Sequence, residues 1–426
     1  SQRMDLKSKL ISEYKELEKT LTPGIARDEA IAAFESVGFP AKKNEEWRFT
    51  NIAPITNGPF TVRTDSAIGV KKLEKYKEYN FDANVIVIHN GHYNGELSKI
   101  HNTDSKIIIG NLFDAKNIKS AAVKNLYGKS ALAAADGFTA LNASFSGAGA
   151  FVLVKKNARP EKPLIILNIT DSSDTISNTR NLIILEDNAY ADVSEVYYSE
   201  NKNVSNCVTE IFLSENSELH HNKIQNDGIE SFHVGTTSVH QEKSSRLYSS
   251  VISWGGSFIR NTLNSLIDGE GIDCYFRGFY LAKENQFIDN HTLADHAKPA
   301  SHSNELYRGI IDANGSVVFN GKIMVRKDAQ KTNAYQTNNN ILLSDDASAN
   351  AKPQLEIFAD DVKCSHGATT GQINEDEIFY LRARGIGESE ARKMLLSAYA
   401  REVIDEISFG QMRELVTARL EEKLSS

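Results

Sequence analysis

The sequence predicts a mainly β protein whose middle is a parallel β-solenoid and whose two ends are helical. Short apolar or alternating runs follow one another from about Phe151 to Ile357, which is typical of strands. Helical periodicity is nearly absent over the same two-hundred-residue stretch. Because these strands are too numerous for one small sandwich, a solenoid is favoured over a sandwich or a barrel.

Polar turn residues separate the expected strands. The runs are Pro163–Ile169, Asn181–Leu185, Tyr190–Tyr198, Cys207–Leu213, Ser316–Phe319, Gly321–Val325 and Asn340–Leu343. Turn signals such as Asp227 followed by Gly228 stand between them. The Asn-rich segment Asn333–Asn340 suits amides that stack inside a solenoid or along its turns, although the repeat is not exact.

The N-terminal end carries helical signals. One helical face is formed by Leu6, Leu10, Tyr14, Leu17 and Leu21. We expect a second helix with Thr22 as its N-cap and Pro23 in its first turn. Gly38 followed by Pro40 should end that helix.

The C-terminal end also carries an amphipathic stripe, which runs from Ala391 to Ile407. Ser408 and Gln411 match a capping box that would open a last helix. Packing of this stripe on its own domain is the simpler interpretation, and docking of a partner is the alternative. The resulting division is 1–60 helical, 61–150 mixed α/β, 151–370 solenoid and 371–426 helical.

Composition narrows the function. The 426 residues carry a net charge of −8 and no dense basic run, so nucleic acid is not expected as a partner. No apolar stretch is long enough to span a membrane, and the charged first ten residues do not read as a signal peptide. The three cysteines are far apart, which favours the reducing cytoplasm over a disulfide framework.

The segment Asp360–Gly371 is the strongest candidate for chemistry. In a strand, Cys364 and His366 would point to the same face and could share one ligand or one proton. Thiolate and imidazole together suit iron, zinc or copper(I). They supply only half a coordination shell, so another chain would have to supply the rest. A buried cysteine beside a hydrogen-bonded histidine is the simpler alternative, and the roles of Asp360 and Asp361 stay open.

Other candidate residues give weaker signals. His291, His296 and His302 lie near Asp289 and could bind a divalent metal, but structural hydrogen bonding fits their spacing better. Cys207 and Cys274 sit in apolar runs and are expected in the core. No phosphate-cradling loop and no dinucleotide fingerprint is present, so the chain should not hydrolyse ATP itself.

The stretch from Asp289 to Ala398 closely resembles the shared core of the SufB/SufD family. The matching pieces begin at Asp289, Tyr307, Val318, Ala329, Gln336, Pro353, Asp360 and Phe379. The segment Asn44–Thr50 resembles the connector after the N-terminal helices of the SufD branch. Cys364, Ser365 and His366 also resemble that branch, because SufB-like chains typically have Glu-His-Glu there.

This resemblance implies a right-handed parallel β-helix that acts as a scaffold in iron–sulfur cluster assembly, and not as an enzyme. It implies pairing with SufB through the β-helix and docking of the SufC ATPase on the C-terminal helices, through Met394, Leu395, Tyr399, Met412 and Leu415. It also implies that His366 faces a nascent cluster shared with SufB, while Cys364 is either a second group at that interface or a structural residue. No cofactor is expected to be held stably by this chain alone; iron or a cluster would be transient, and a flavin in the complex stays open.

Two alternatives remain. The chain could be a stand-alone homodimeric metal-binding β-helix, since an isolated chain would otherwise expose its pairing surface. It could also be a polysaccharide-acting β-helix enzyme, although such proteins are usually secreted.

Overall fold

The computed structural model describes residues 3–62, 81–101, 104–130 and 136–426. Within these ranges the α-helices are α1 (Leu6–Leu17), α2 (Arg27–Val37), α3 (Ala53–Thr56), α5 (Ala115–Ile118), α6 (Ala121–Leu126), α7 (Gly137–Phe145), α8 (Glu375–Arg382), α9 (Glu388–Ile404) and α10 (Gly410–Ser425). A short 3-10 helix, η1, covers Glu45–Trp47.

The strands are β1 (Asn84–His89), β2 (His92–Lys99), β3 (Ile107–Asn111), β4 (Ala150–Val154), β5 (Leu164–Thr170), β6 (Thr175–Leu185), β7 (Tyr190–Ser199), β8 (Asn203–Leu213), β9 (Glu218–Asn226), β10 (Phe232–Gln241), β11 (Arg246–Ser253), β12 (Phe258–Ile267), β13 (Asp273–Ala282), β14 (Phe287–His296), β15 (His302–Ile311), β16 (Ser316–Val325), β17 (Asn333–Leu342), β18 (Ser348–Ile357) and β19 (Lys363–Gly371).

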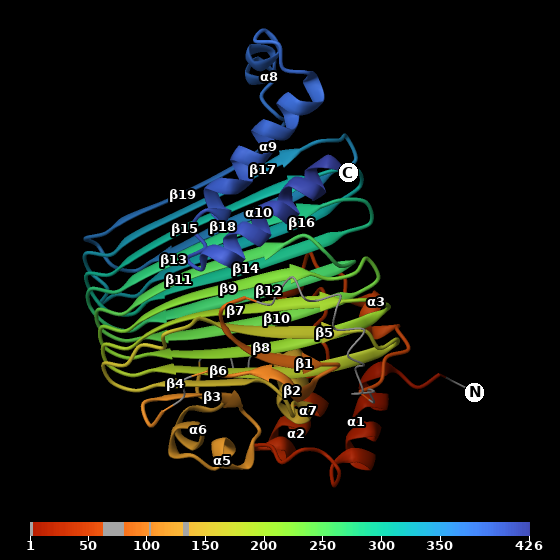
Figure 1. Ribbon diagram of the computed structural model, residues 1–426, viewed down its shortest axis with the longest axis vertical. Helices are drawn as coiled ribbons and strands as arrows, with labels where there is room; N and C mark the ends of the chain where they lie inside the picture. Colours follow the sequence, from red (N-terminus) through yellow and green to blue (C-terminus); the bar gives the residue numbers. More distant parts are fainter. Residues whose placement is uncertain (1–2, 63–80, 102–103, 131–135) are drawn as a thin grey trace.

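Consecutive strands from β4 onward lie in opposite sheets, which confirms the parallel solenoid. The odd strands from β5 to β19 continue a ten-stranded sheet and the even strands from β4 to β18 a nine-stranded sheet, all pairing in parallel (Figure 1). Each turn of chain therefore adds one strand to each sheet. Ser316–Val325 forms one continuous strand, although two short runs were expected there.

Side chains of like position stack from turn to turn inside the solenoid. Ile259, Ile288 and Val317 are neighbours in register on three successive even strands, and all are buried. The Asn-rich segment is β17, where Asn338 and Asn340 point inward and bond each other at 3.0 Å. The inward placement is thus confirmed for these two residues, but not a stack of amides from turn to turn, because their register neighbours on β15 are Tyr307 and Gly309.

Helices cover the outer faces of the two sheets. The N-terminal helices and α7 pack on the even sheet through an apolar cluster that includes Leu10, Phe34 and Phe138. Helices α9 and α10 lie across the odd sheet, where α9 contacts β11, β13 and β15 (Figure 1). Covering on both sides explains why strands such as β8 are buried along their whole length.

Two expected helix starts were wrong. Helix α2 begins at Arg27 and not at Thr22, because the Arg27 guanidinium bonds Thr22 O at 2.5 Å and holds the preceding segment as a loop. Helix α10 has no side-chain cap: Ser408 donates to Asp192, and Gln411 accepts from the Asp82 amide at 3.1 Å. Both side chains of the expected capping box therefore make tertiary hydrogen bonds and do not cap the helix. The expected end of α2 at Gly38 is confirmed, with φ of +68°.

Candidate functional site

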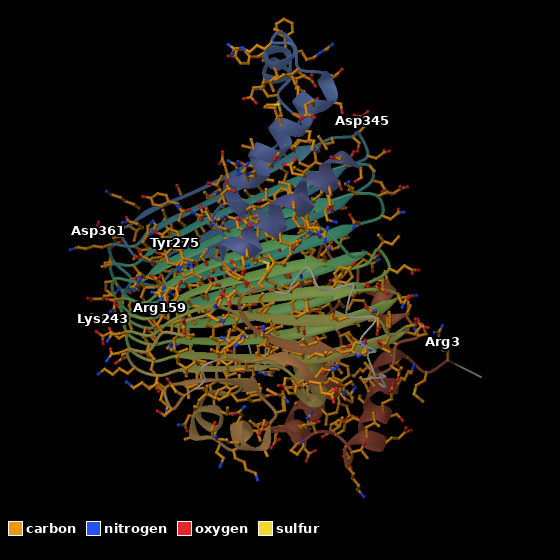
Figure 2. The ribbon with its side chains drawn as sticks, viewed as in Figure 1. Arg3, Arg159, Lys243, Tyr275, Asp345 and Asp361 are labelled. Carbon is orange, nitrogen blue, oxygen red and sulfur yellow. The ribbon has the colours of Figure 1, made fainter. Side chains whose placement is uncertain are left out.

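The C-terminal end of the solenoid is open. Strands β18 and β19 are the edges of the two sheets, and nearly every residue of β19 is exposed. Helix α8 follows β19 but leaves the stack and stands beyond the last turn (Figure 1). Figure 2 shows Asp345 and Asp361, from the turns before and after β18, on opposite sides of this open end. An uncovered strand edge is a template for pairing with another chain.

The β19 edge presents a regular row of free amides. Lys363 N donates to Thr332 O at 2.9 Å, so the odd residues of β19 direct their backbone groups toward β17. Backbone direction alternates along a parallel strand, so Cys364, His366 and Ala368 direct their N–H groups outward. The same residues are those whose side chains face the solenoid interior, since they pair in register with inward residues of β17.

The β18 edge is interrupted. Ser348 N donates to Gly315 O and Phe358 N to Val325 O, so the even residues of β18 bond to β16 and the odd ones face the free edge. Pro353 is one of these odd residues and has no N–H to offer. A partner strand therefore finds a complete row of donors on β19 and an incomplete one on β18.

Cys364 and His366 lie together on β19 and face the mouth of the open end, as the sequence predicted for a shared strand face. His366 is exposed, and its ring makes no hydrogen bond with the described residues. Cys364 is half-buried against Ala334 and Val362, and this burial raises the pKa of its thiol. His366 is therefore the more accessible side chain of the pair, and Cys364 is less readily a thiolate.

Two exposed apolar side chains lie at one end of this mouth. Ile357 is 39 % exposed and Phe358 62 % exposed at the end of β18. Exposed apolar groups beside a free strand edge are typical of a protein interface. Asp360 and Asp361 donate their backbone amides to the Gln330 side chain, at 3.2 and 2.9 Å, while their own side chains are exposed.

The histidine cluster near Asp289 is split by the fold. His291 faces outward and contacts Asp289 at 2.9 Å and Glu46 at 3.2 Å, which raises its pKa, while His296 faces inward and bonds Ser303. His302 lies on the other sheet. Among the described residues, no group of three or more His, Cys, Asp or Glu is placed to hold a metal ion.

Helices α9 and α10 use most of their apolar stripe on the odd sheet. Of the five residues expected to contact a partner, Met412 is fully buried, Leu395 and Leu415 are partly buried against the sheet, and the Tyr399 hydroxyl bonds Asn339 O at 2.6 Å. Only Met394 is an exposed side chain, at 43 %.

Sequence reasoning missed the two most exposed aromatic residues of this region. Phe379 is 74 % exposed and Tyr380 55 % exposed, both on the projecting helix α8. The available signal was that Phe379 and Tyr380 are adjacent aromatic residues that lie before, and outside, the apolar stripe from Ala391 to Ile407. We call Phe379 and Tyr380 on α8, together with the exposed Met394 on α9, the α8 tip.

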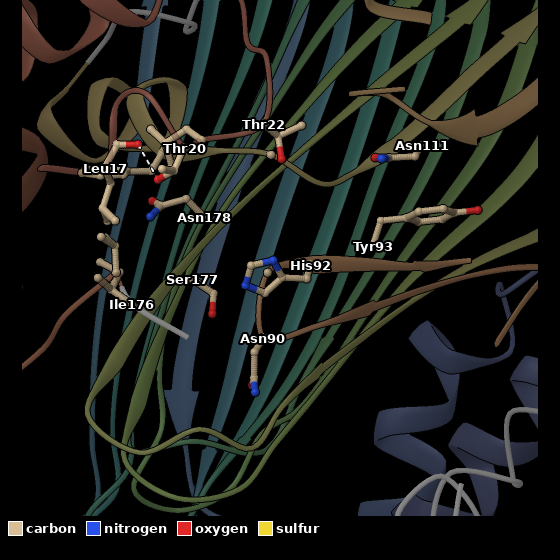
Figure 3. A pocket seen from close by; sticks show the side chains of 15 residues that line it. Leu17, Thr20, Thr22, Asn90, His92, Tyr93, Asn111, Ile176, Ser177 and Asn178 are labelled. Atoms are coloured by element: carbon tan, nitrogen blue, oxygen red, sulfur yellow. Dashed lines mark hydrogen bonds between the residues drawn. The ribbon is translucent and has the colours of Figure 1, made fainter. Parts of the chain in front are cut away.

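A cavity lies at the opposite, N-terminal end of the solenoid. It has a volume of about 470 Å³ and is lined by Thr22, His92, Tyr93, Asn111 and Ser177, among others (Figure 3). No carboxylate lines it among the described residues, whereas glycoside hydrolysis ordinarily needs a pair of them. This cavity therefore gives the polysaccharide alternative no support.

No helix within the described ranges is long and apolar enough to cross a membrane.

The two buried cysteines, Cys207 and Cys274, are in the core as expected.

Comparison with known proteins identifies the family of this chain. Residues 168–399 match the family described as "SUF system FeS cluster assembly, SufBD core domain", and residues 6–166 match "SufBD protein N-terminal region". An iron–sulfur cluster assembly SufBD family protein of Synechocystis is 31 % identical over 412 residues, covering 92 % of this chain and 90 % of the relative.

Two relatives carry the SufD name. The iron–sulfur cluster assembly protein SufD of Escherichia coli is 29 % identical, covering 91 % of this chain and 90 % of the relative. SufD of Bacillus subtilis is 26 % identical, covering 90 % and 89 %. The chain belongs to the SufB/SufD family of iron–sulfur cluster assembly proteins.

Proposed function

We propose that this chain is the SufD-type scaffold subunit of a cytoplasmic cluster-assembly complex. In this proposal the open end pairs with a SufB-type chain. The observation that carries it is the uncovered β19 edge. Cys364 and His366 each direct their backbone N–H outward from this edge and their side chain toward the solenoid interior. A strand added to this edge would bring the partner's side chains to the mouth where His366 lies.

The cluster is the cargo of this interface. His366 offers a free imidazole, which suits iron, and the remaining ligands would come from the partner because no complete set exists within the described chain. Splitting the ligand set makes the site depend on how the two subunits are arranged. A nucleotide-driven change worth a few kcal/mol would then suffice to assemble or release it.

The second partner, a SufC-type ATPase, is assigned to the α8 tip. Phe379 and Tyr380 are exposed apolar groups on the projecting helix α8, and Met394 is an exposed apolar group in the N-terminal half of α9. Residues buried under α9 and α10, such as Met412, would hold these helices in place instead of touching the ATPase. This refines the docking surface expected from the sequence.

The experiment is cluster assembly by the full complex, with His366→Ala as the test. We expect the variant to enter the complex with both partners, since the side chain is exposed, and to lose at least tenfold in the rate of cluster formation. Ser365→Ala, one residue away and facing outward, is the matched control. Undiminished assembly by His366→Ala would remove His366 from the site.

A further inference from the structure

A buried glutamine lies directly beneath His366. Gln336 on β17 is the register neighbour of His366, and Glu305 on β15 is in turn the neighbour of Gln336. Neighbouring strands are about 4.8 Å apart, so these three inward side chains form one column that leads from the interior to the mouth. Gln336 is 2 % exposed and Glu305 4 %.

One end of the Gln336 amide is fixed from below. Its Nε2 donates to Glu305 Oε2 at 3.2 Å, while Thr292 donates to the other oxygen of the same carboxylate. Gly321 on the facing strand makes room for this arrangement, because a Cβ there would lie 2.4 Å from Gln336 Nε2. The amide is therefore held in one orientation by groups from both sheets.

The other end of the amide has no partner. Gln336 Oε1 is buried and accepts no hydrogen bond from the described residues. A buried carbonyl oxygen without a donor is unfavourable and rare in folded proteins, so such an atom calls for an explanation. The only residue above it in the column is His366, whose ring nitrogens are also free of the described residues.

We propose that Gln336 is a positioning residue for His366: its Oε1 accepts the N–H of one ring nitrogen and leaves the other nitrogen, as a lone-pair donor, facing the partner. Histidines that bind metals usually donate their second N–H to an oxygen in this way, which fixes tautomer and ring orientation. This inference rests on the proposed function of His366, but its first test does not require cluster assembly.

The first test measures the His366 ring in the isolated chain. Nitrogen NMR of ¹⁵N-histidine-labelled protein reports which ring nitrogen carries the proton, with His366→Ala used to assign the signal. At a pH where the spectra show the ring to be neutral, we expect one tautomer to dominate by about tenfold, the ratio that one net hydrogen bond supports. Gln336→Met, which keeps the side-chain volume, should reduce that ratio at least threefold.

Gln354→Met on β18 is the matched control, because Gln354 is on the last turn but faces outward. It should leave the tautomer ratio unchanged. An equal ratio in wild type and folded Gln336→Met would overturn the inference. If Gln336→Met fails to fold, Gln336→Glu, which keeps an acceptor at the same position, gives the second measurement: retention of the dominant tautomer supports the inference, and its loss contradicts it.

The second test uses the full complex. Gln336→Met should slow cluster formation about tenfold while leaving complex mass unchanged. If His366→Ala has no effect on assembly but the NMR result holds, the proposed function fails and the positioning contact stands. If His366→Ala abolishes assembly and Gln336→Met changes neither readout, only the positioning inference fails.

Discussion

The two ends of the solenoid are built in opposite ways. At the N-terminal end, β2 and β3 run antiparallel to their neighbours, and α5 and α6 cover the first turn through an apolar cluster with β4. At the C-terminal end, β18 and β19 stay parallel to the stack and nothing described covers their edges. The covered N-terminal end blocks the addition of another strand, whereas the uncovered C-terminal end allows it. A solenoid built in this way can pair with a partner at one end only.

Packing at glycines gives the first way to test this contrast. Gly149, beside β4 at the closed end, has no room for a side chain, because a Cβ would lie 1.6 Å from Arg180 O. Gly149→Ala should lower the free energy of unfolding by about 3 kcal/mol. Gly367→Ala on β19 meets no atom within 4 Å and should change it by less than about 0.5 kcal/mol. Equal losses in chemical denaturation would show that the last turn is as tightly packed as the first.

Two methionines sharpen the distinction between covering and docking. Met412→Ala removes a fully buried side chain from the α10 contact with the odd sheet and should cost about 3 kcal/mol of unfolding free energy. Met394→Ala at the α8 tip should cost under about 0.5 kcal/mol but weaken binding of the ATPase. Calorimetry of both variants, with and without the ATPase, separates the two roles. A stability loss in Met394→Ala matching that in Met412→Ala would contradict the assignment.

A buried carboxyl group near the open end, that of Glu305 on β15, makes the free energy of unfolding depend on pH. Burial raises the pKa of Glu305 to about 7 from 4.5. The folded protein therefore keeps this proton to a higher pH than the unfolded chain, and stability present below pH 4.5 is lost as pH rises through 7. Glu305→Gln should match wild type at pH 4.5 and exceed it by about 3 kcal/mol at pH 9. The check is a series of denaturation curves across that range, and a gap that does not grow with pH would contradict it.

The smallest effect is expected at His366. Because the ring is exposed and makes no hydrogen bond with the described residues, His366→Ala should change unfolding free energy by less than about 0.5 kcal/mol. Thermal unfolding measures this directly. A larger loss would mean that the residue supports the fold instead of facing a ligand.

The repeating part of the fold could be predicted from the sequence because short apolar runs between turn residues indicate each strand locally. The run Tyr190–Tyr198 falls within β7, although its alternation does not hold throughout, since Glu195 lies inside and Val196 lies in the apolar cluster with α9 and α10. The inward position of Asn338 and Asn340 does not follow from alternation, which would place polar residues outside. Helix starts could not be predicted equally well. The Ser408 and Gln411 side chains are taken by Asp192 and the Asp82 amide, contacts that join residues hundreds of positions apart.

The site was predictable in part for a similar reason. Placing Cys364 and His366 on one face needs only the two-residue period of a strand. The column beneath His366 needs the register between strands β15, β17 and β19, and no pattern within one strand reveals that Gln336 and Glu305 line up with it. The free β19 edge and the interruption at Pro353 likewise depend on which strands come last.

Pairing through the β19 edge is the central claim, and Ala368→Pro tests it most directly. The Ala368 N–H faces outward, so proline removes a donor from the edge while the bonds to β17 stay. Ala368→Ser, which keeps the N–H, is the control. Light scattering of each purified chain mixed with a SufB-type partner should show the heterodimer mass for wild type and Ala368→Ser and separate chains for Ala368→Pro. A heterodimer of unchanged mass and affinity with folded Ala368→Pro would contradict pairing through this edge.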